Sequence, residues 1–279
     1  MKEKEKLKEL RKTLFLTGYK ASIAHIASAF SIVEILYTLY NKNILKYDSK
    51  NPQWEDRDIF ILSKGHGSLA YYTILQDVGF FSKEVLDTFS KPGSILGGEP
   101  ALPHIPGVEA TTGSLGHGLS YGVGIAIAKK MDNKKEKVYV LLGDGECQEG
   151  TIWEAVMYAN HMNLDNLIII VDCNKIQKMS TLENVMSIDS WKNKFKSFGC
   201  NIIEVDGHNV SKLEKAFNKE NLTNKPTVIL ANTIKGKGVS IVENDPRWHF
   251  KLPSKKELKV FVSELEITEE EIEACKEHM

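Results

Sequence analysis

Four short apolar runs in the second half of the chain constrain its fold more than any other feature. They are KVYVLL at 137–142, LIIIVD at 167–172, NIIEV at 201–205 and TVILAN at 227–232. The segments 149–163 and 209–220 between them have the apolar spacing of helices. Strands that are apolar along nearly their whole length and alternate with helices are typical of a parallel sheet covered by helices on both faces. The sequence therefore predicts an α/β fold.

The remaining segments are predicted to extend and cover this sheet. Apolar residues spaced by three and four predict that the first forty residues are helical. Residues 58–62 form a further predicted strand, and helices are predicted around 70–75, after Ser82, at 116–131, after Ser254 and from Thr268. Residues 91–113 are rich in Gly and Pro, and such a long loop in a compact domain is usually functional. Without a repeat or linker, residues 1–279 are expected to form one domain with helical N-terminal and C-terminal extensions.

Charge and cysteine content exclude several classes of protein. Lys and Arg number 36 against 37 Asp and Glu, so the net charge of −1 argues against binding nucleic acid or a membrane surface. No apolar run approaches the ~20 residues of a membrane-spanning helix, and the charged start MKEKEKLKELRK is unlike a signal peptide. The four cysteines are widely spaced, which indicates free thiols in a reducing compartment. We therefore expect a cytoplasmic protein.

The tripeptide Gly143-Asp144-Gly145 is the first candidate functional motif. It follows the predicted strand at 137–142 and precedes a predicted helix. Ligands of open parallel sheets bind at the carboxyl ends of the strands. The two glycines allow a backbone to approach a ligand closely, and the start of a helix offers free N–H groups to an anion. A dinucleotide-binding turn is disfavoured because Gln148 stands where that motif has its third glycine.

A second polar group ends the next predicted strand. Asn174 follows Asp172 and Cys173, and adjacent parallel strands joined by one helix would place it beside Asp144. The Asp144 carboxylate, the Asn174 amide and the carbonyl of Ile176 offer hard oxygen ligands. They suit Mg²⁺, or another divalent cation such as Ca²⁺ or Mn²⁺, together with phosphate oxygens. This arrangement is typical of sites for thiamine diphosphate.

Together these segments resemble the transketolase family, in its N-terminal, diphosphate-binding half. The resemblance covers nearly the whole chain and is carried by residues 56–67 (DRDIFILSKGHG), 106–118 (PGVEATTGSLGHG), 141–174, 233–238 (TIKGKG) and 239–249 (VSIVENDPRWH). It implies a thiamine-diphosphate-binding fold in which residues 1–279 form the single diphosphate-binding domain. It also implies that Asp144, Asn174 and the Ile176 carbonyl hold the metal ion.

The resemblance implies further site residues. Cofactor contacts are expected from His66, Gly113, Leu115, Gly143, Gly145, Glu146, Asn174 and Ile176, and catalytic roles from His25, His66 and His249. Glu149 and Glu154 match acidic residues at the family's dimer interface. We assign packing roles to Cys147 and Cys173, and no role to His104, His161, His208 and His278. Lys235 and Lys237 either steer an anionic substrate or lie in a solvated loop.

The sequence departs from the family pattern at four places. His25 lies in Ile23-Ala24-His25-Ile26-Ala27 where the family has Ser-Gly-His-Pro-Gly, and Glu99 replaces the histidine of a Gly-His-Pro loop. His117 replaces a glutamine, and Phe250 stands where glycine is common. A carboxylate at position 99 would repel a phosphate and accept hydrogen bonds from hydroxyls. We therefore hypothesise a modified sugar as donor or acceptor.

A full transketolase continues through a pyrimidine-binding domain, which this sequence does not include. We therefore predict a split enzyme that transfers a two-carbon ketol unit from a ketose to an aldose, with sugar phosphates as the expected substrate class. A C-terminal transketolase-like subunit would supply the pyrimidine site and the activating glutamate, most simply in a heterotetramer. Two alternatives stay open: a component of a 2-oxo-acid dehydrogenase or synthase, and a non-catalytic cofactor-binding subunit.

Overall fold

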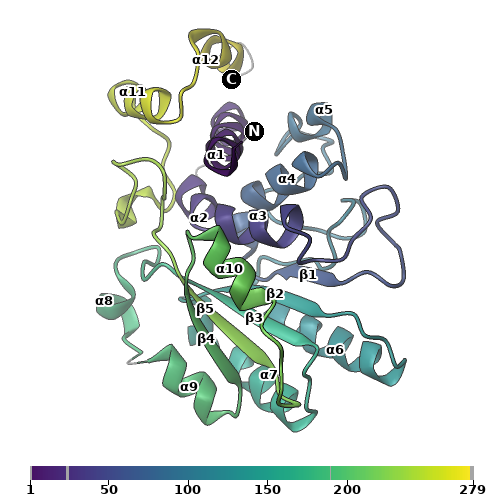
Figure 1. Cartoon of the computed structure of the whole chain (residues 1–279). Coiled ribbons are helices and arrows are strands. Elements are labelled where there is room, and N and C mark those ends of the chain that lie inside the picture. The colour runs from purple at the N-terminus through teal and green to yellow at the C-terminus, as the bar shows by residue number, and fades with distance from the viewer. Residues whose placement is uncertain (1, 23–24, 189, 277–279) are drawn as a thin grey trace.

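A five-stranded parallel sheet forms the centre of the computed structural model, which describes residues 2–22, 25–188 and 190–276. The strands are β1 (Ile59–Leu62), β2 (Val138–Gly143), β3 (Leu167–Cys173), β4 (Asn201–Asp206) and β5 (Thr227–Asn232). They lie in the order β1-β2-β3-β5-β4, and every neighbouring pair is parallel (Figure 1). The predicted α/β fold is confirmed, and each strand lies within two residues of its predicted position.

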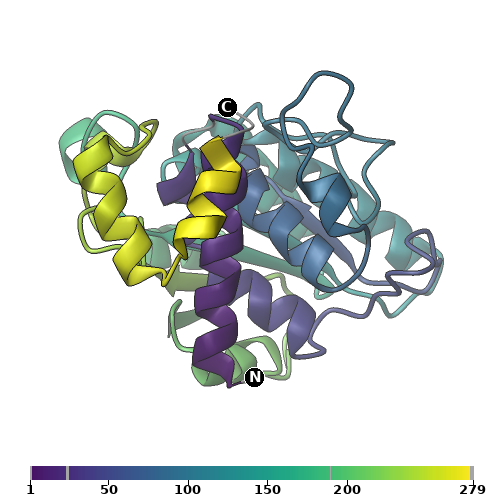
Figure 2. The ribbon, with the colours of Figure 1, turned by 90° about the horizontal axis from the view of Figure 1, so that it is seen from above.

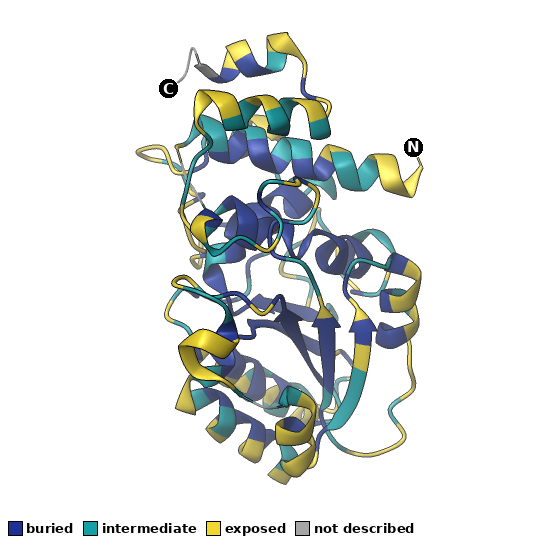
Figure 3. Ribbon diagram, turned by 90° about the vertical axis from the view of Figure 1, so that its left-hand side faces the viewer, coloured by how far each residue is buried: buried dark blue, intermediate teal, exposed yellow. Residues whose placement is uncertain are grey.

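Alternate residues of the strands face two separate cores. On β2, Tyr139 and Leu141 pack with α1 (Glu3–Lys20), α2 (Ile26–Phe30), α3 (Val33–Asn41), α4 (Ser68–Asp77) and α10 (Val210–Phe217). Val138, Val140 and Leu142 pack on the other face with α6 (His117–Met131), α7 (Gly150–His161) and α9 (Trp191–Ser197). Strands β1, β2, β3 and β5 are therefore buried from both sides, as their apolar runs predict, whereas the edge strand β4 is only partly buried (Figure 3).

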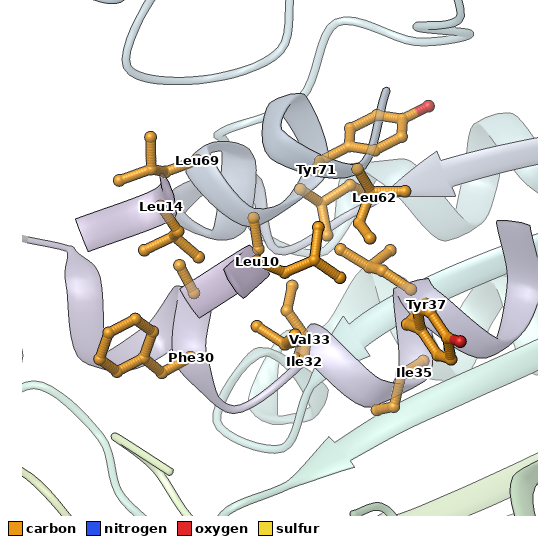
Figure 4. Packing of buried hydrophobic residues seen from close by; sticks show 14 of the residues in the cluster. Leu10, Leu14, Phe30, Ile32, Val33, Ile35, Tyr37, Leu62, Leu69 and Tyr71 are labelled. Atoms are coloured by element: carbon orange, nitrogen blue, oxygen red, sulfur yellow. The ribbon is translucent and has the colours of Figure 1, made fainter. Parts of the chain in front are cut away.

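The N-terminal forty residues are mostly helical, as predicted, and the helical stretch is divided into α1, α2 and α3. Leu10 and Leu14 of α1 pack against Phe30 and Val33 of the two following helices, as Figure 4 shows. The helical stretch is interrupted at Ser31, whose hydroxyl donates to the buried carboxylate of Asp172 at 2.6 Å and lies 3.1 Å from the Ser28 carbonyl oxygen. The break between α2 and α3 thus coincides with a polar contact to β3. Residues 23 and 24 lie outside the described residues.

Helix α6 packs close to the sheet through two of its glycines. A Cβ at Gly122 would lie 2.4 Å from Val140 Cγ2, and one at Gly118 would lie 2.8 Å from Ser63 Cα. Residues 91–113, between α5 (Lys83–Leu86) and α6, contain neither helix nor strand, in agreement with the prediction. The close packing places the start of α6 beside the carboxyl end of β1.

The C-terminal helices cover the N-terminal layer. Helix α11 (Lys255–Glu264) starts after Ser254, whose hydroxyl accepts from the N–H of Glu257 as predicted for an N-cap. Helix α12 (Glu269–Lys276) lies along α1 (Figure 2). The short helix α8 (Leu182–Met186) and helix α9 were not predicted, although Thr181 and Ser190 cap them. Among the described residues, no helix combines the length and apolar character needed to cross a membrane.

Candidate functional site

Asp144 lies at the carboxyl end of β2, beside the end of β3. The strands pair Gly143 with Asp172, and α7 connects them, so the predicted adjacency is correct. The buried Asp144 carboxylate accepts hydrogen bonds from the backbone N–H groups of Gly145, at 2.7 Å, and Lys175. Burial and the nearby charge of Asp172 raise the pKa of Asp144 to about 6. Within the described part of the chain, no lysine or arginine forms an ion pair with it.

Asn174 and Ile176 lie at the same place as Asp144. The Asn174 amide donates to Asp172 Oδ2 at 2.9 Å and accepts from the Ile176 N–H at 3.1 Å, which fixes its orientation. Asp144, Asn174 and Ile176 together line an open cavity of about 900 Å³ at the carboxyl edge of the sheet. The structure thus brings the three predicted metal ligands to one cavity.

A buried ion pair that sequence reasoning missed lies directly behind these residues. Lys64 Nζ is 2.5 Å from Asp172 Oδ2, and both side chains are buried. The hydroxyls of Ser31 and Thr233 also donate to the Asp172 carboxylate. Burial opposes ionisation of Asp172, but Lys64 outweighs it and lowers the pKa of Asp172. The two partners are 108 residues apart, so no local pattern indicates the pair.

Three histidines predicted to act in catalysis form one group. His25 lies just before α2, His66 in the 3₁₀ turn Gly65–Gly67, and His249 just after the 3₁₀ turn Pro246–Trp248. Their ring centroids are 5.9 Å apart for His25 and His66, 5.5 Å for His25 and His249, and 5.9 Å for His66 and His249. The ring of Phe250 packs edge-on against the ring of His25, with 4.7 Å between the two ring centroids. Three distant segments therefore converge on one spot.

These imidazoles are neutral at neutral pH. Burial first, and then nearby lysines, lower the pKa of all three histidines, that of His249 to about 3. A neutral imidazole has one donor and one acceptor. The group can therefore orient hydroxyls and carbonyls, while the positive charge of the site comes from lysines.

Lys235 joins the histidine group to the cavity of Asp144. Its buried Nζ donates to the Ile176 carbonyl at 3.2 Å and lies 2.8 Å from His249 Nδ1. Burial and the charge of Lys64 lower the pKa of Lys235 to about 8. Of the two alternatives for this residue, the structure supports a place inside the site. Lys237 is half-buried and pairs with Glu243 at 3.3 Å.

The donor set fits a divalent cation with a phosphorylated ligand. Asp144 is a buried carboxylate without a cationic partner among the described side chains, and the amide and carbonyl oxygens beside it are hard ligands. The Ile176 carbonyl accepts from Lys235 but retains a second lone pair. Gly145, next to Asp144, packs closely on Gln177, since a Cβ at this position would lie 2.9 Å from Gln177 Nε2.

The carboxylate of Glu99 lies against Gly113. A Cβ at Gly113, whose φ is +140°, would lie 1.8 Å from Glu99 Oε2, and one at Gly65 would lie 2.8 Å from Gly113 Cα. Gly113 is therefore held between the Glu99 carboxylate and the Gly65 backbone. Leu115 is half-buried, and its carbonyl accepts from His117 Nδ1 at 3.2 Å.

Glu146 and Gly143 lie behind the cavity. The buried Glu146 carboxylate accepts from Ser63 Oγ at 2.5 Å, from the Gly116 N–H at 2.9 Å and from the Gly143 N–H at 3.0 Å. It ties the ends of β1 and β2 to the start of α6, and it is not among the residues that line the cavity. A cofactor contact by Glu146 stays a prediction, because its oxygens are directed into this junction.

The other residues considered from the sequence lie around this centre. Glu149 and Glu154 are exposed at the start of α7, and Cys147 and Cys173 are buried free thiols. His104 and His161 are exposed, and His278 lies outside the described residues. His208, for which the sequence indicated no role, contacts Glu34 and the backbone of Ile234.

Known proteins share this architecture. The sequence pattern of the family described as "Transketolase, thiamine diphosphate binding domain" matches residues 5–268. An apulose-4-phosphate transketolase subunit of Phocaeicola vulgatus is 41% identical over 264 residues, which cover 94% of this chain and 93% of that protein. A 6-deoxy-6-sulfo-D-fructose transketolase subunit of Clostridium sp. is 39% identical over 248 residues, which cover 88% and 90%.

A solved structure agrees with these relatives. The crystal structure of transketolase from Campylobacter jejuni has a TM-score of 0.86 and 31% identity to this chain. The match covers 95% of this chain and 43% of the Campylobacter chain, so this chain spans less than half of that transketolase. From the buried parallel sheet, the cavity at its carboxyl edge and these matches, we conclude that the chain belongs to the transketolase family and contains its thiamine diphosphate-binding domain.

Proposed function

We propose that this chain is the diphosphate-binding subunit of a split transketolase, which transfers a two-carbon ketol unit from a ketose to an aldose. The observation that carries the proposal is the meeting of Asp144, Asn174 and Ile176 at one cavity. The group of neutral histidines beside it supplies hydrogen-bonding groups for a sugar. Two relatives that this chain covers almost end to end are named as transketolase subunits, which supports the same assignment.

In this proposal the cavity holds thiamine diphosphate and a divalent cation, with Mg²⁺ as the expected ion. The Asp144 carboxylate, the Asn174 amide oxygen and the Ile176 carbonyl would bind the cation. When bound, the cofactor supplies an electron sink for the transferred ketol unit. Lys235 contributes positive charge beside the Ile176 carbonyl, where a diphosphate would need it. His25, His66 and His249 would orient the polar groups of the sugar.

A separate C-terminal subunit would complete the active site with the pyrimidine-binding site and the activating glutamate, in a heterotetramer with two copies of each chain. The outer face of α6 and α7 supports such a partner. Tyr121, Met157 and Tyr158 are about half exposed on these helices, and the exposed Glu149 and Glu154 lie on or next to α7. Aromatic and methionine side chains that are exposed on a surface are typical of protein interfaces.

Glu99 suggests a substrate other than the usual pentose phosphates. Its exposed carboxylate lies against Gly113, which in turn packs on the backbone of Gly65. A carboxylate there disfavours a phosphate and accepts hydrogen bonds from hydroxyls or from a cationic substituent. The relatives named above are called transketolases of apulose 4-phosphate and of a sulfonated fructose. We therefore propose a modified sugar as donor or acceptor.

Cofactor binding is tested by thermal unfolding of the chain with Mg²⁺ and thiamine diphosphate, in the absence and in the presence of the candidate partner chain. Any ligand at 100 times its dissociation constant stabilises the folded state by about 2.7 kcal/mol. Asp144→Ala should abolish this stabilisation because it removes the one carboxylate that would hold the cation. Glu204→Ala, which changes another carboxylate of the same cavity, is the matched control. An unchanged response in Asp144→Ala would exclude the assigned site.

The split-enzyme proposal is tested by ketol transfer with and without the partner subunit. We expect activity only from the assembled complex, and normal turnover by this chain alone would refute the proposal. Substrate preference is tested with xylulose 5-phosphate and a panel of modified sugars, for the native complex and for Glu99→His. Comparable rates on all sugars in the native complex would refute the modified-sugar proposal. Glu84→Gln, an exposed carboxylate on α5, serves as control.

A further inference from the structure

Three buried or nearly buried side chains behind the candidate site form a hydrogen-bonded group, which we call the Glu34 triad: Arg11, Glu34 and His208. Arg11 Nη2 donates to Glu34 Oε2 at 2.7 Å, and His208 Nδ1 contacts the same oxygen at 2.9 Å. Arg11 lies on α1, Glu34 on α3 and His208 in the turn between β4 and α10. None of the three lines the cavity of Asp144.

Glu34 is ionised in this setting. Burial opposes its charge, but the charge of Arg11 and the hydrogen bonds from His208 and Arg11 outweigh the burial and lower the pKa of Glu34 to about 2. The carboxylate therefore attracts donors from both sides. A buried carboxylate with two donors holds its partners in a fixed geometry.

His208 bridges Glu34 to the backbone of a functional segment. The Ile234 N–H donates to His208 Nε2 at 2.8 Å, so Nε2 acts as acceptor and carries no hydrogen. The ring hydrogen is then on Nδ1, from which it is donated to Glu34. One neutral imidazole thus connects a buried carboxylate to the residue immediately before Lys235.

Arg11 holds the other end of the same segment. Its Nε donates to the Lys237 carbonyl at 2.7 Å, and a Cβ at Gly238 would lie 2.7 Å from Arg11 Cδ. The backbone on both sides of Lys235 is therefore attached to the triad. Between these two attachments, Lys235 reaches the Ile176 carbonyl and His249.

The turn that carries His208 packs directly on this segment. A Cβ at Gly207 would lie 2.4 Å from Thr233 Cγ2, and the Gly207 N–H donates to the Asn232 carbonyl at 2.8 Å. Only glycine allows this approach, so the place of His208 relative to residues 233–238 is fixed by backbone contact.

We propose that His208, held by Glu34 and Arg11, is a positioning residue that sets the place of Lys235 in the candidate site. It touches neither the cavity nor the histidine group, and it acts through the Ile234 backbone. The positioning of Lys235 by His208 depends only on contacts within this chain. Only the consequence for cofactor binding rests on the proposed function.

The placement of Lys235 is tested by acetylating lysines of the full chain and measuring each rate by peptide mass spectrometry. Lys235 is buried in the native chain and should react slowly. In His208→Ala it should react about tenfold faster, as expected when a segment loses one buried hydrogen bond that restrains its opening. Lys64, buried but bonded to Asp172, should stay protected, and exposed Lys212 should not change.

Two further variants separate positioning from general loosening. His208→Gln keeps a donor for Glu34 and an acceptor for the Ile234 N–H, so it should restore the slow acetylation of Lys235. His161→Ala, which removes an exposed histidine of α7, should leave all rates unchanged. An unchanged Lys235 rate in His208→Ala, or equal acceleration of Lys235 and Lys64, would overturn the proposal.

Binding of thiamine diphosphate with Mg²⁺ to the same variants links the positioning to function. We expect His208→Ala to weaken binding about tenfold, which corresponds to the loss of one well-placed charged contact. If acetylation of Lys235 accelerates while binding stays unchanged, the positioning stands and the proposed role of Lys235 toward the cofactor fails. If the native chain and its partner subunit bind no thiamine diphosphate, the proposed function fails, and the acetylation result still decides on His208.

Discussion

The ends of β2 and β3 carry two buried carboxylates in contrasting surroundings. Asp172, at the end of β3, pairs with Lys64 and accepts from the hydroxyls of Ser31 and Thr233. Asp144 follows β2 and receives two backbone N–H bonds, without a cationic partner in the described part of the chain. Accordingly, the pKa of Asp172 is lowered, whereas burial and Asp172 raise the pKa of Asp144 to about 6.

The comparison distinguishes a buried carboxylate that is paired within the fold, Asp172, from one that is available to a ligand, Asp144. A buried ion needs a partner of opposite sign, because desolvation is costly. The protein supplies that partner for Asp172, whereas a bound cation would supply it for Asp144. The end of β3 is therefore complete in the chain alone, whereas the end of β2 has a buried carboxylate without a cationic partner among the described side chains.

Replacing Lys64 should destabilise the protein by breaking the buried ion pair at the end of β3. In Lys64→Met, the Asp172 charge stays buried without its cation, so we expect a loss of about 3–5 kcal/mol in the free energy of unfolding. Urea denaturation of the ligand-free chain measures this loss. Lys130→Met, which breaks an exposed pair with Asp165, is the control and should change stability by less than about 1 kcal/mol.

A double variant checks the cause. Adding Asp172→Asn to Lys64→Met removes the uncompensated charge, and it should recover part of the lost stability. Equal stability of Lys64→Met and Lys130→Met would contradict the contrast between the two strand ends.

These two carboxylates also show what the sequence could predict. The strands are encoded by contiguous apolar runs, and Asp144 and Asn174 follow two consecutive runs, so local pattern suffices to place them together. Asp172 stands in the same motif, but its partner Lys64 is 108 residues away. A single sequence contains no signal for such a pair.

The same reason explains the other misses. Arg11 and Lys237 are 226 residues apart, and His208 joins Glu34 to Ile234 from a third segment. The break between α2 and α3 coincides with the bond from Ser31 to Asp172, a long-range contact that helical periodicity does not indicate. Helices α8 and α9 are short, and their apolar pattern is correspondingly weak.

Glu34 is a third buried carboxylate. The protein pairs its charge with Arg11, as it pairs the charge of Asp172 with Lys64. Its folded pKa of about 2 lies below the ordinary value of 4.5. It therefore contributes its full stabilisation above pH 4.5, and this contribution is lost as the pH falls toward 2. The expected size is about 3 kcal/mol.

Unfolding free energies of the native chain and of Glu34→Gln between pH 6 and pH 2.5 measure this contribution. The advantage of the native chain should shrink as the pH falls through this window. Glu270→Gln on exposed α12 should show no such trend. If the difference in unfolding free energy between the native chain and Glu34→Gln did not change with pH, Glu34 would not be a carboxylate that the protein stabilises through its partners.

Asp144→Asn tests the end of β2 in the ligand-free chain, where the carboxylate has no cationic partner among the described side chains. The change relieves the repulsion from Asp172 and the cost of a buried charge, but it turns an NH₂ group toward one of two backbone donors. Because these effects oppose each other, we expect stability within about 1 kcal/mol of the native chain. Urea denaturation without Mg²⁺ is the measurement. A loss as large as that of Lys64→Met would mean that Asp144 is structural.

The smallest expected effect comes from an ion pair that matches Lys64–Asp172 in length but not in burial. Lys192 Nζ lies 2.5 Å from Glu204 Oε2, and these side chains are 52% and 46% exposed, against 1% and 0% for Lys64 and Asp172. Lys192→Ala should therefore cost less than about 1 kcal/mol, and the cost should fall further in high salt. If Lys192→Ala proved as damaging as Lys64→Met, distance rather than burial would set the strength of these pairs. The contrast between Asp172 and Asp144 would then need another explanation.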